Sequence, residues 1–147
     1  MKSALPTRVA LVVLATAIAS LASDSLEKLK ARADAASGKQ QAKLCLEYVQ
    51  GELDVANSLF SQGQVENGQA AIAEVVAYSE KGTNAAIGSR KYRKETEIEL
   101  RRTANRLHDI ADSLSFEDRD PAKAAVEKIQ QLRSRLLASM FGPKAEP

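Results

Sequence analysis

Apolar residues spaced alternately three and four positions apart occupy the middle of this chain. This spacing places the side chains along one side of an α-helix, and such a seam is buried when the helix packs lengthwise against others. The first seam consists of Leu46, Val49, Leu53, Ala56 and Phe60. A second seam follows 54 residues later, at Leu100, Thr103, Leu107, Ile110 and Leu114. The two seams predict two long helices that share a core.

The 54-residue repetition extends into the helix that follows each seam. Ala71 is matched by Ala125, and Val75 is matched by Ile129. Duplication and convergence on a helical period both explain the matches, and both give two similar helical hairpins. Two such hairpins can bury their apolar faces on each other. We therefore expect an all-α fold, an up-and-down four-helix bundle made of two helical hairpins and preceded by a short N-terminal helix.

The composition suits such a bundle. Hydrophobic residues make up 44% of the chain but aromatic residues only 4%, so aliphatic side chains have to fill the core. A length of 147 residues suits one domain with one core. We expect this domain to span residues 23–142 and residues 143–147 to form a disordered tail.

Residues 1–22 have the pattern of a secretory signal peptide. Lys2 and Arg8 precede an uncharged apolar run that ends at Ala19, and Ala22 places a small side chain before a cleavage point. The run is shorter than the roughly 20 residues of a membrane-spanning helix. We therefore expect a cleaved signal peptide and an exported protein, periplasmic or secreted. The alternative is an uncleaved N-terminal anchor.

The apolar phase and the positions of glycine and proline predict five helices. Ser37 and Gly38 interrupt the first two, and Ser37 is expected to cap the second helix together with Gln40. A single helix that continues through Gly38 is the alternative. The expected helices span residues 24–36, 39–61, 66–81, 84–114 and 121–141.

Glycine and proline also predict the later boundaries. Gly82 is expected to end the third helix, and Thr83 or Asn84 to cap the next one. Asp120 is expected as the N-cap of the fifth helix and Pro121 as its first residue. The fourth helix is then the longest, and its basic start is expected to extend beyond its neighbours.

Net charge gives no reason to expect a polyanionic partner. Without Lys2 and Arg8 the 21 basic residues fall to 19, which equals the 19 acidic ones. We therefore predict no nucleic-acid partner.

Charge is nevertheless segregated along the sequence. Residues 44–80 carry six acidic residues and no basic one, whereas residues 81–108 carry eight basic and three acidic residues. Opposite charge is expected to make these two segments face each other. The expected pairs are Glu47 with Arg101 and Glu52 with Arg106.

Basic residues cluster at the start of the expected fourth helix, where they could bind phosphate or an anionic lipid. The candidate interaction patch consists of Arg90, Lys91, Arg93, Lys94, Arg101 and Arg102. Acidic residues interleave with it, and Glu97 lies four positions from both Arg93 and Arg101. That spacing is typical of a solvated, salt-bridged helix. A membrane surface is therefore a possible partner but not the favoured one.

No group of residues predicts catalysis or a cofactor. His108 and Asp112 are one helical turn apart, but a surface ion pair is the favoured interpretation. Cys45 lies between two leucines and is interpreted as a small buried side chain. The haem motif Cys-x-x-Cys-His and the paired Glu-x-x-His of di-iron bundles are absent. We expect no enzyme activity, cofactor or metal; a hydrolase would need two carboxylates facing one pocket.

The first hairpin resembles a tetratricopeptide unit. Within residues 59–72, Gly63, Val65 and the small residue Gly68 fall where that repeat places them. The resemblance covers one hairpin, and the 54-residue spacing departs from the roughly 34-residue repeat of that family.

The whole chain after residue 22 is similar to uncharacterised exported helical proteins of bacteria. The similarity is carried by residues 113–118, Pro121 and residues 140–142. It implies a helical fold and export, and it carries no activity.

These patterns favour a non-enzymatic exported scaffold or protein-interaction module with an unidentified protein partner. The alternative is an envelope carrier or chaperone-like protein that holds an apolar ligand or an unfolded chain. A closed core favours the first function, and an exposed apolar groove favours the second.

Overall fold

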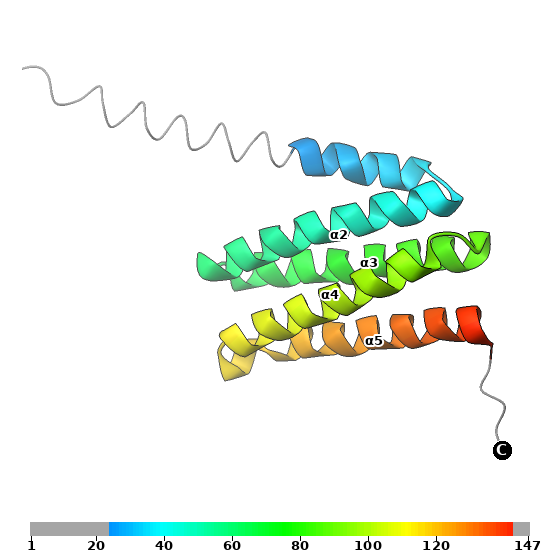
Figure 1. Cartoon of the computed structure of the whole chain (residues 1–147). Coiled ribbons are helices and arrows are strands. Elements are labelled where there is room, and N and C mark those ends of the chain that lie inside the picture. The colour runs from blue at the N-terminus through cyan, green and yellow to red at the C-terminus, as the bar shows by residue number, and fades with distance from the viewer. Residues whose placement is uncertain (1–23, 143–147) are drawn as a thin grey trace, which may run out of the picture.

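A computed structural model describes residues 24–142 of the chain (Figure 1). Every regular element in that range is a helix, which confirms the expected all-α fold. The elements are a first helix at residues 24–35, α2 (Gly38–Ser61), α3 (Val65–Ser89), α4 (Arg93–Ser113), the short 3₁₀ helix η1 (Phe116–Asp118) and α5 (Asp120–Phe141). The expected signal peptide, residues 1–22, and the expected tail, residues 143–147, lie outside the described residues and stay predictions.

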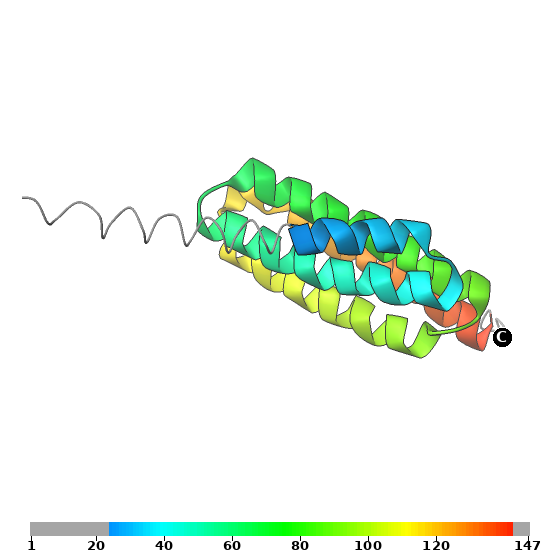
Figure 2. The same cartoon turned by 90° about the horizontal axis from the view of Figure 1, so that it is seen from above.

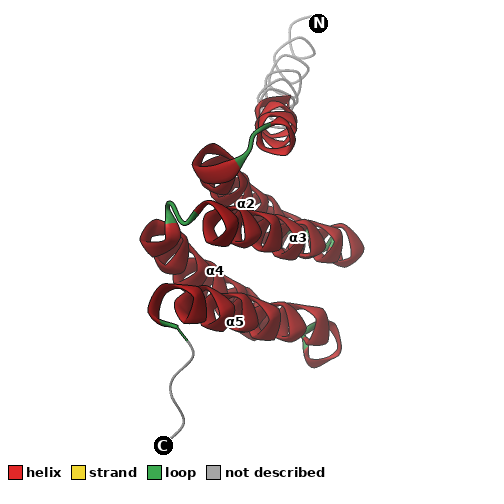
Figure 3. Ribbon diagram, turned by 90° about the vertical axis from the view of Figure 1, so that its right-hand side faces the viewer, coloured by secondary structure: helices red, strands yellow, loops and turns green. Residues whose placement is uncertain are grey.

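The helices are stacked in layers (Figure 3). α2 and α3 form one antiparallel hairpin, and α4 and α5 form a second. Between the hairpins, α3 packs on α5 and α2 packs on α4. Helix 24–35 lies on the other face of the first hairpin (Figure 2), where Leu26 contacts Gly51. Described residues therefore cover the first hairpin on both faces and the second on one.

The hairpins repeat in space with the offset found in the sequence. α2 begins at Gly38 and α4 at Arg93, while α3 ends at Ser89 and α5 at Phe141. Each pair of matched boundaries lies within two residues of the 54-residue offset. Residue 35, the last of the first helix, likewise lies 54 residues before Ser89. The first helix thus stands where the second helix of a preceding hairpin would stand.

The two seams form the core, as the sequence predicts. Leu53 and Leu107 have no exposed surface, and neither do Val49 and Leu100. Burying each leucine contributes roughly 1.5–3 kcal/mol, so these positions contribute substantially to the stability of the fold. Val55 of α2, which belongs to neither seam, has 38% of its surface exposed. Among residues 24–142, no helix combines the length and the hydrophobicity needed to cross a membrane.

The predicted end of the third helix at Gly82 is wrong, because α3 continues to Ser89. A methyl group added at Gly82 would lie 3.1 Å from Cys45 Cβ and 3.4 Å from the Ala42 carbonyl oxygen. Glycine therefore permits close approach of α2 and α3 at this point. Thr83 caps nothing, since it is buried within α3 and its hydroxyl donates to the Ser79 carbonyl at 2.7 Å.

The predicted long helix over residues 84–114 is also wrong, because a sharp turn separates α3 from α4. Arg90 and Tyr92 adopt left-handed backbone conformations, with φ of 57° and 64°. Residues other than glycine adopt this region infrequently. The turn brings the basic run between two helices instead of leaving it on a projecting helix.

Two smaller corrections concern helix starts. Gly38 has a φ of 56°, so the chain does break there, but Ser37 makes no side-chain capping hydrogen bond and the predicted capping box is wrong. Asp120 is the first helical residue of α5 and Arg119 is its N-cap, one position earlier than predicted. A shift of this size is ordinary at helix ends.

Candidate functional site

The structure separates the six residues of the predicted basic patch. Arg90 and Lys91 lie in the α3–α4 turn, and Lys94 lies in the first turn of α4. All three are exposed, and none forms an ion pair with another residue of 24–142. These three positions keep their charge available to an outside partner.

The other three residues of the patch are placed differently. Arg93 donates from Nη1 to the Ser139 carbonyl oxygen at 2.8 Å, which ties the start of α4 to the end of α5. Arg102 pairs with Glu99 at 2.9 Å, and Arg101 is exposed further along α4. The predicted patch is therefore not one continuous surface.

The salt bridges predicted within α4 do not form. Glu97 pairs instead with Arg133 of α5, with 2.7 Å between Oε1 and Nε. The spacing of four in the sequence favoured partners within the helix, but the partner comes from the neighbouring helix. Glu97 therefore does not neutralise the basic run of its own helix.

Basic side chains from three elements gather at one end of the stack. The start of α2 lies beside the end of α3, since a methyl group at Gly38 would lie 3.6 Å from Ser89 Cβ. We call this region the basic end; it consists of Arg32, Lys39, Lys43, Arg90, Lys91 and Lys94, all exposed. The nearby carboxylates are Glu47 and Glu95, which are exposed, and Asp34, which binds Lys81.

Acidic side chains gather at the opposite end, where α3 and α5 begin and α4 ends (Figure 1). We call this the acidic end; it consists of Glu66, Asp109, Asp112, Glu117, Asp118 and Asp120. Charge is thus segregated along the long axis of the stack, although only Glu66 of the acidic end belongs to the acidic segment 44–80. A comparison of sequence segments does not reveal this arrangement, because it does not say which helix ends lie together.

The facing charges of the two hairpins differ from those predicted. Arg106 binds Asp54, and it also donates to the Gln50 side-chain oxygen at 3.1 Å. The predicted partner, Glu52, lies beside Tyr48 on the face turned toward helix 24–35. Burial raises the pKa of the Glu52 carboxyl. The acidic and basic segments do meet, but through Asp54.

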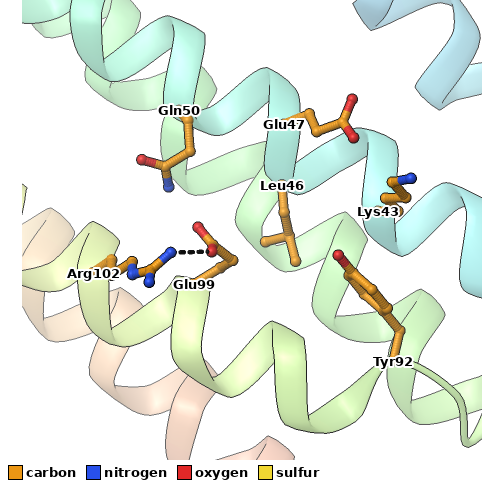
Figure 4. A pocket seen from close by; sticks show the side chains of 7 residues that line it. All are labelled: Lys43, Leu46, Glu47, Gln50, Tyr92, Glu99 and Arg102. Atoms are coloured by element: carbon orange, nitrogen blue, oxygen red, sulfur yellow. Dashed lines mark hydrogen bonds and ion pairs between the residues drawn. The ribbon is translucent and has the colours of Figure 1, made fainter.

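An open cleft of about 390 Å³ lies between α2 and α4 (Figure 4). Its lining residues are Lys43, Leu46, Glu47, Gln50, Tyr92, Glu99 and Arg102. The two acids of this cleft meet the condition set for a carboxylate hydrolase only in part. Glu99 is paired with Arg102 at 2.9 Å, and Glu47 is exposed to solvent.

Tyr92 stands at the mouth of this cleft in its left-handed conformation. Burial raises the pKa of its hydroxyl, and the charges of Glu95, Glu99 and Glu47 raise it further. The hydroxyl therefore stays protonated at neutral pH and can donate a hydrogen bond. The cleft is suited to weak contact with a polar group.

His108 and Cys45, for which no catalytic role was predicted, are placed as follows. His108 Nδ1 lies 3.2 Å from Asp112 Oδ2, and both side chains are about two-thirds exposed. Cys45 is buried, and burial raises the pKa of its thiol to about 11, which suppresses the nucleophilic thiolate. Within residues 24–142, no three or more His, Cys, Asp or Glu side chains are grouped so as to hold a metal ion.

A tyrosine cluster that the sequence did not reveal fastens helix 24–35 to the first hairpin. Tyr48 and Tyr78 meet edge to face with 4.6 Å between ring centroids. The Tyr78 hydroxyl donates to Asp34 Oδ1 at 2.8 Å, and the Tyr48 hydroxyl donates to Glu74 at 2.9 Å. Burial raises the pKa of both tyrosines. Both hydroxyls thus remain donors.

Two lysines complete the tyrosine cluster. Lys30 pairs with Glu74 at 3.0 Å and lies 5.6 Å from the centroid of the Tyr78 ring. Lys81 pairs with Asp34 at 2.6 Å. The contacts join residues of the first helix to residues more than 40 positions away, so no local sequence pattern marks them.

An apolar groove of about 340 Å³ lies between the early turns of α3 and α5. Its lining residues are Gln69, Ile72, Ala73, Val76, Pro121, Ala124, Ala125 and Lys128. The small side chains of α5 leave the groove open along the helix.

Comparisons with protein-family models, with curated proteins and with solved structures found no match. The resemblances of the first hairpin and of the whole chain therefore rest on their own residues.

Proposed function

We propose that this chain is a non-enzymatic exported scaffold that acts as a protein-interaction module. The observation that carries the proposal is the closed core. Large aliphatic side chains from both hairpins, including Leu53, Leu107, Ile129 and Leu136, have no exposed surface. A core of this kind has no room for an apolar cargo, so contact with a partner has to take place on the surface.

The scaffold we propose is a four-helix bundle of two hairpins, with the second hairpin laid on the first. Its support is the contact of α3 with α5 and of α2 with α4. Charge at the two ends of this body gives it a direction, so it can hold different partners at its two ends.

Export is the part of the proposal that rests on residues 1–22. Mass spectrometry of the exported protein is expected to show an N-terminus near Ser23, because Ala22 ends a suitable cleavage site. An exported species that still begins at Met1 would contradict cleavage and favour the anchor.

The interaction is tested by capture from the envelope fraction. The C-terminally tagged protein is crosslinked in cells, purified and compared with a tag-only control. We expect a reproducible envelope protein that is retained by the wild type and reduced when the core is disrupted by Leu107→Ala. Retention of nothing beyond the control would count against the interaction module.

The α3–α5 groove favours the second candidate, a carrier that holds an apolar ligand. Ala124 lines this groove, whereas Ala70 is exposed on α3 outside it. If the groove binds an apolar fluorescent probe, Ala124→Arg should lower the affinity and Ala70→Arg should leave it unchanged. Equal binding by the wild type and Ala124→Arg would exclude the groove.

A further inference from the structure

We propose that the basic end docks on an anionic lipid surface. This inference rests on the proposed scaffold function and deepens it, because it names what one end of the scaffold holds. The first observation is that the six basic side chains are exposed and that none forms an ion pair with a residue of 24–142. Each lysine or arginine near an anionic bilayer strengthens binding about fivefold.

The second observation is an exposed aromatic residue at the same end. Phe141, the last residue of α5, has 78% of its surface exposed. The hydrogen bond from Arg93 to Ser139 places the end of α5 beside the start of α4 and therefore beside Lys94. Basic side chains around an exposed aromatic ring are typical of surfaces that rest at the headgroup level of a bilayer.

The acidic groups at this end do not cancel the charge. Asp34 is bound by Lys81 and by the Tyr78 hydroxyl. Glu47 and Glu95 remain exposed, so two free carboxylates stand against six free cations. The local charge is positive, although the chain after residue 22 has none overall.

The acidic end of a second copy is the competing occupant. Phe116 is also exposed there, at 84%. The end of a four-helix body is small, because each helix is only about 10–12 Å across. Stable protein interfaces bury about 800 Å² on each partner, and each exposed ion pair strengthens binding at most about fivefold. A lipid surface needs no shape complementarity, and we therefore choose it.

Vesicle binding tests the proposal. The protein is purified in the form that is present in cells. It is then mixed with vesicles of equimolar phosphatidylglycerol and phosphatidylcholine, or of phosphatidylcholine alone. We expect co-sedimentation with the anionic vesicles only, and less binding at high salt. Equal binding to both vesicles, or no binding to either, would overturn the proposal.

Two triple variants locate the surface. The first carries Arg90→Gln, Lys91→Gln and Lys94→Gln; the matched control carries Lys28→Gln, Arg101→Gln and Lys123→Gln, which are also exposed and without ion pairs among residues 24–142. Three lost contacts should weaken binding on the order of 100-fold in the first variant. The control should bind like the wild type. An equal loss in both would mean that net charge acts and that no docking surface exists.

A double variant in α2 tests the basic end without touching the strained α3–α4 turn. Lys39→Gln with Lys43→Gln removes two charges and should weaken binding about tenfold or more. Binding equal to that of the wild type would exclude α2 from the docking surface and overturn the basic end as defined. All variants carry the same N-terminus, so the apolar segment before residue 23 cannot cause a difference between them.

Self-association is measured in parallel by analytical ultracentrifugation. Oligomers that are lost both in the first triple variant and in Glu117→Gln with Asp120→Asn would assign the basic end to a second copy and overturn the lipid proposal. Failure of vesicle binding leaves the envelope capture experiment untouched, so the two proposals fail separately.

Discussion

The two hairpins share one sequence offset but differ in how closely their helices approach. In the first, Gly82 of α3 faces Cys45 of α2 with no room for a larger side chain. The residue 54 positions after Gly82 is Leu136, which is fully buried in the second hairpin. α2 and α3 also make the more extensive contact. At equivalent positions of the 54-residue repeat, glycine therefore lets α2 and α3 approach closely, whereas the second hairpin has a buried leucine.

The hairpins differ as well in what covers them. The first lies between helix 24–35 and the second hairpin, whereas described residues cover the second on one face (Figure 3). α3 accordingly buries a wide face, which includes Tyr78, Ser79 and Thr83, while α5 buries a narrower stripe. Similar seams thus acquire different surroundings from their place in the stack.

The largest effects should come from the matched leucines. Leu53→Ala and Leu107→Ala each remove a fully buried side chain, so each should cost about 2–5 kcal/mol of the free energy of unfolding. Denaturant melts measure the loss. The exposed position Val55→Ala should cost clearly less. Losses below about 0.5 kcal/mol at both leucines would show that the seams do not form the core.

The close approach in the first hairpin gives the next largest effect. Gly82→Val forces a branched side chain against Cys45 and the α2 backbone and should cost about 1–3 kcal/mol or more. The control is Gly88→Ala on the same helix, where an added methyl meets nothing within 4 Å; it should be neutral or stabilising by up to about 1 kcal/mol. If thermal melts show equal stability for both variants, α2 and α3 are not held closely at Gly82.

The attachment of helix 24–35 to the first hairpin should depend on pH. Hydrogen bonds from Lys81 and Tyr78 hold the pKa of the Asp34 carboxyl below its ordinary value of 3.8. Stability from this lowered pKa is present above the ordinary value and is lost as the pH falls through the lowered one. Because Asp34 is exposed, Asp34→Asn should cost only about 1 kcal/mol at neutral pH and less in acid.

Hydrogen exchange of residues 24–35 measures this effect locally. Asp34→Asn should raise exchange there at neutral pH and leave α5 unchanged, while Asp24→Asn on the same helix serves as the control. Equal exchange in the two variants would mean that Asp34 does not fasten the helix.

The smallest effect concerns charge between the hairpins. A double-mutant cycle of Asp54→Asn and Arg106→Gln should give a coupling of about 0.2–1 kcal/mol that shrinks with salt, since the pair is partly exposed. The same cycle with Glu52→Gln should be additive, because Glu52 lies on the other face of α2. Coupling for Glu52 and additivity for Asp54 would reverse this assignment.

The sequence predicted the helical seams and most helix ends, but it did not predict the contacts between helices. Both seams were correct because burial of a leucine stripe is a property of one helix, readable from one segment. Gly82 was misread, since glycine serves both as a helix end and as a point of close contact, and only the partner helix distinguishes the two. In the α3–α4 turn the left-handed positions are occupied by Arg90 and Tyr92 instead of glycine, so the residue types at these positions did not predict the turn.

The candidate surface was only half predictable. Arg90, Lys91 and Lys94 were identified, but Lys39 and Lys43 joined them only once α2 was placed beside the end of α3. The tyrosine cluster depends on contacts between Asp34 and Tyr78, 44 positions apart. Such contacts are set by the tertiary arrangement, which a single-sequence pattern does not contain.

Because Cys45 is buried, the reactivity of its thiol reports whether the first hairpin is open or closed. It is the only cysteine in the sequence, and its side chain is sealed between α2 and α3. A thiol reagent reaches the sulfur only when these helices separate, so the labelling rate follows the opening of one hairpin without any introduced probe. In an oxidising compartment the same enclosure delays crosslinking between copies for as long as the hairpin stays closed. The folded first hairpin thus protects the thiol of Cys45 from reaction.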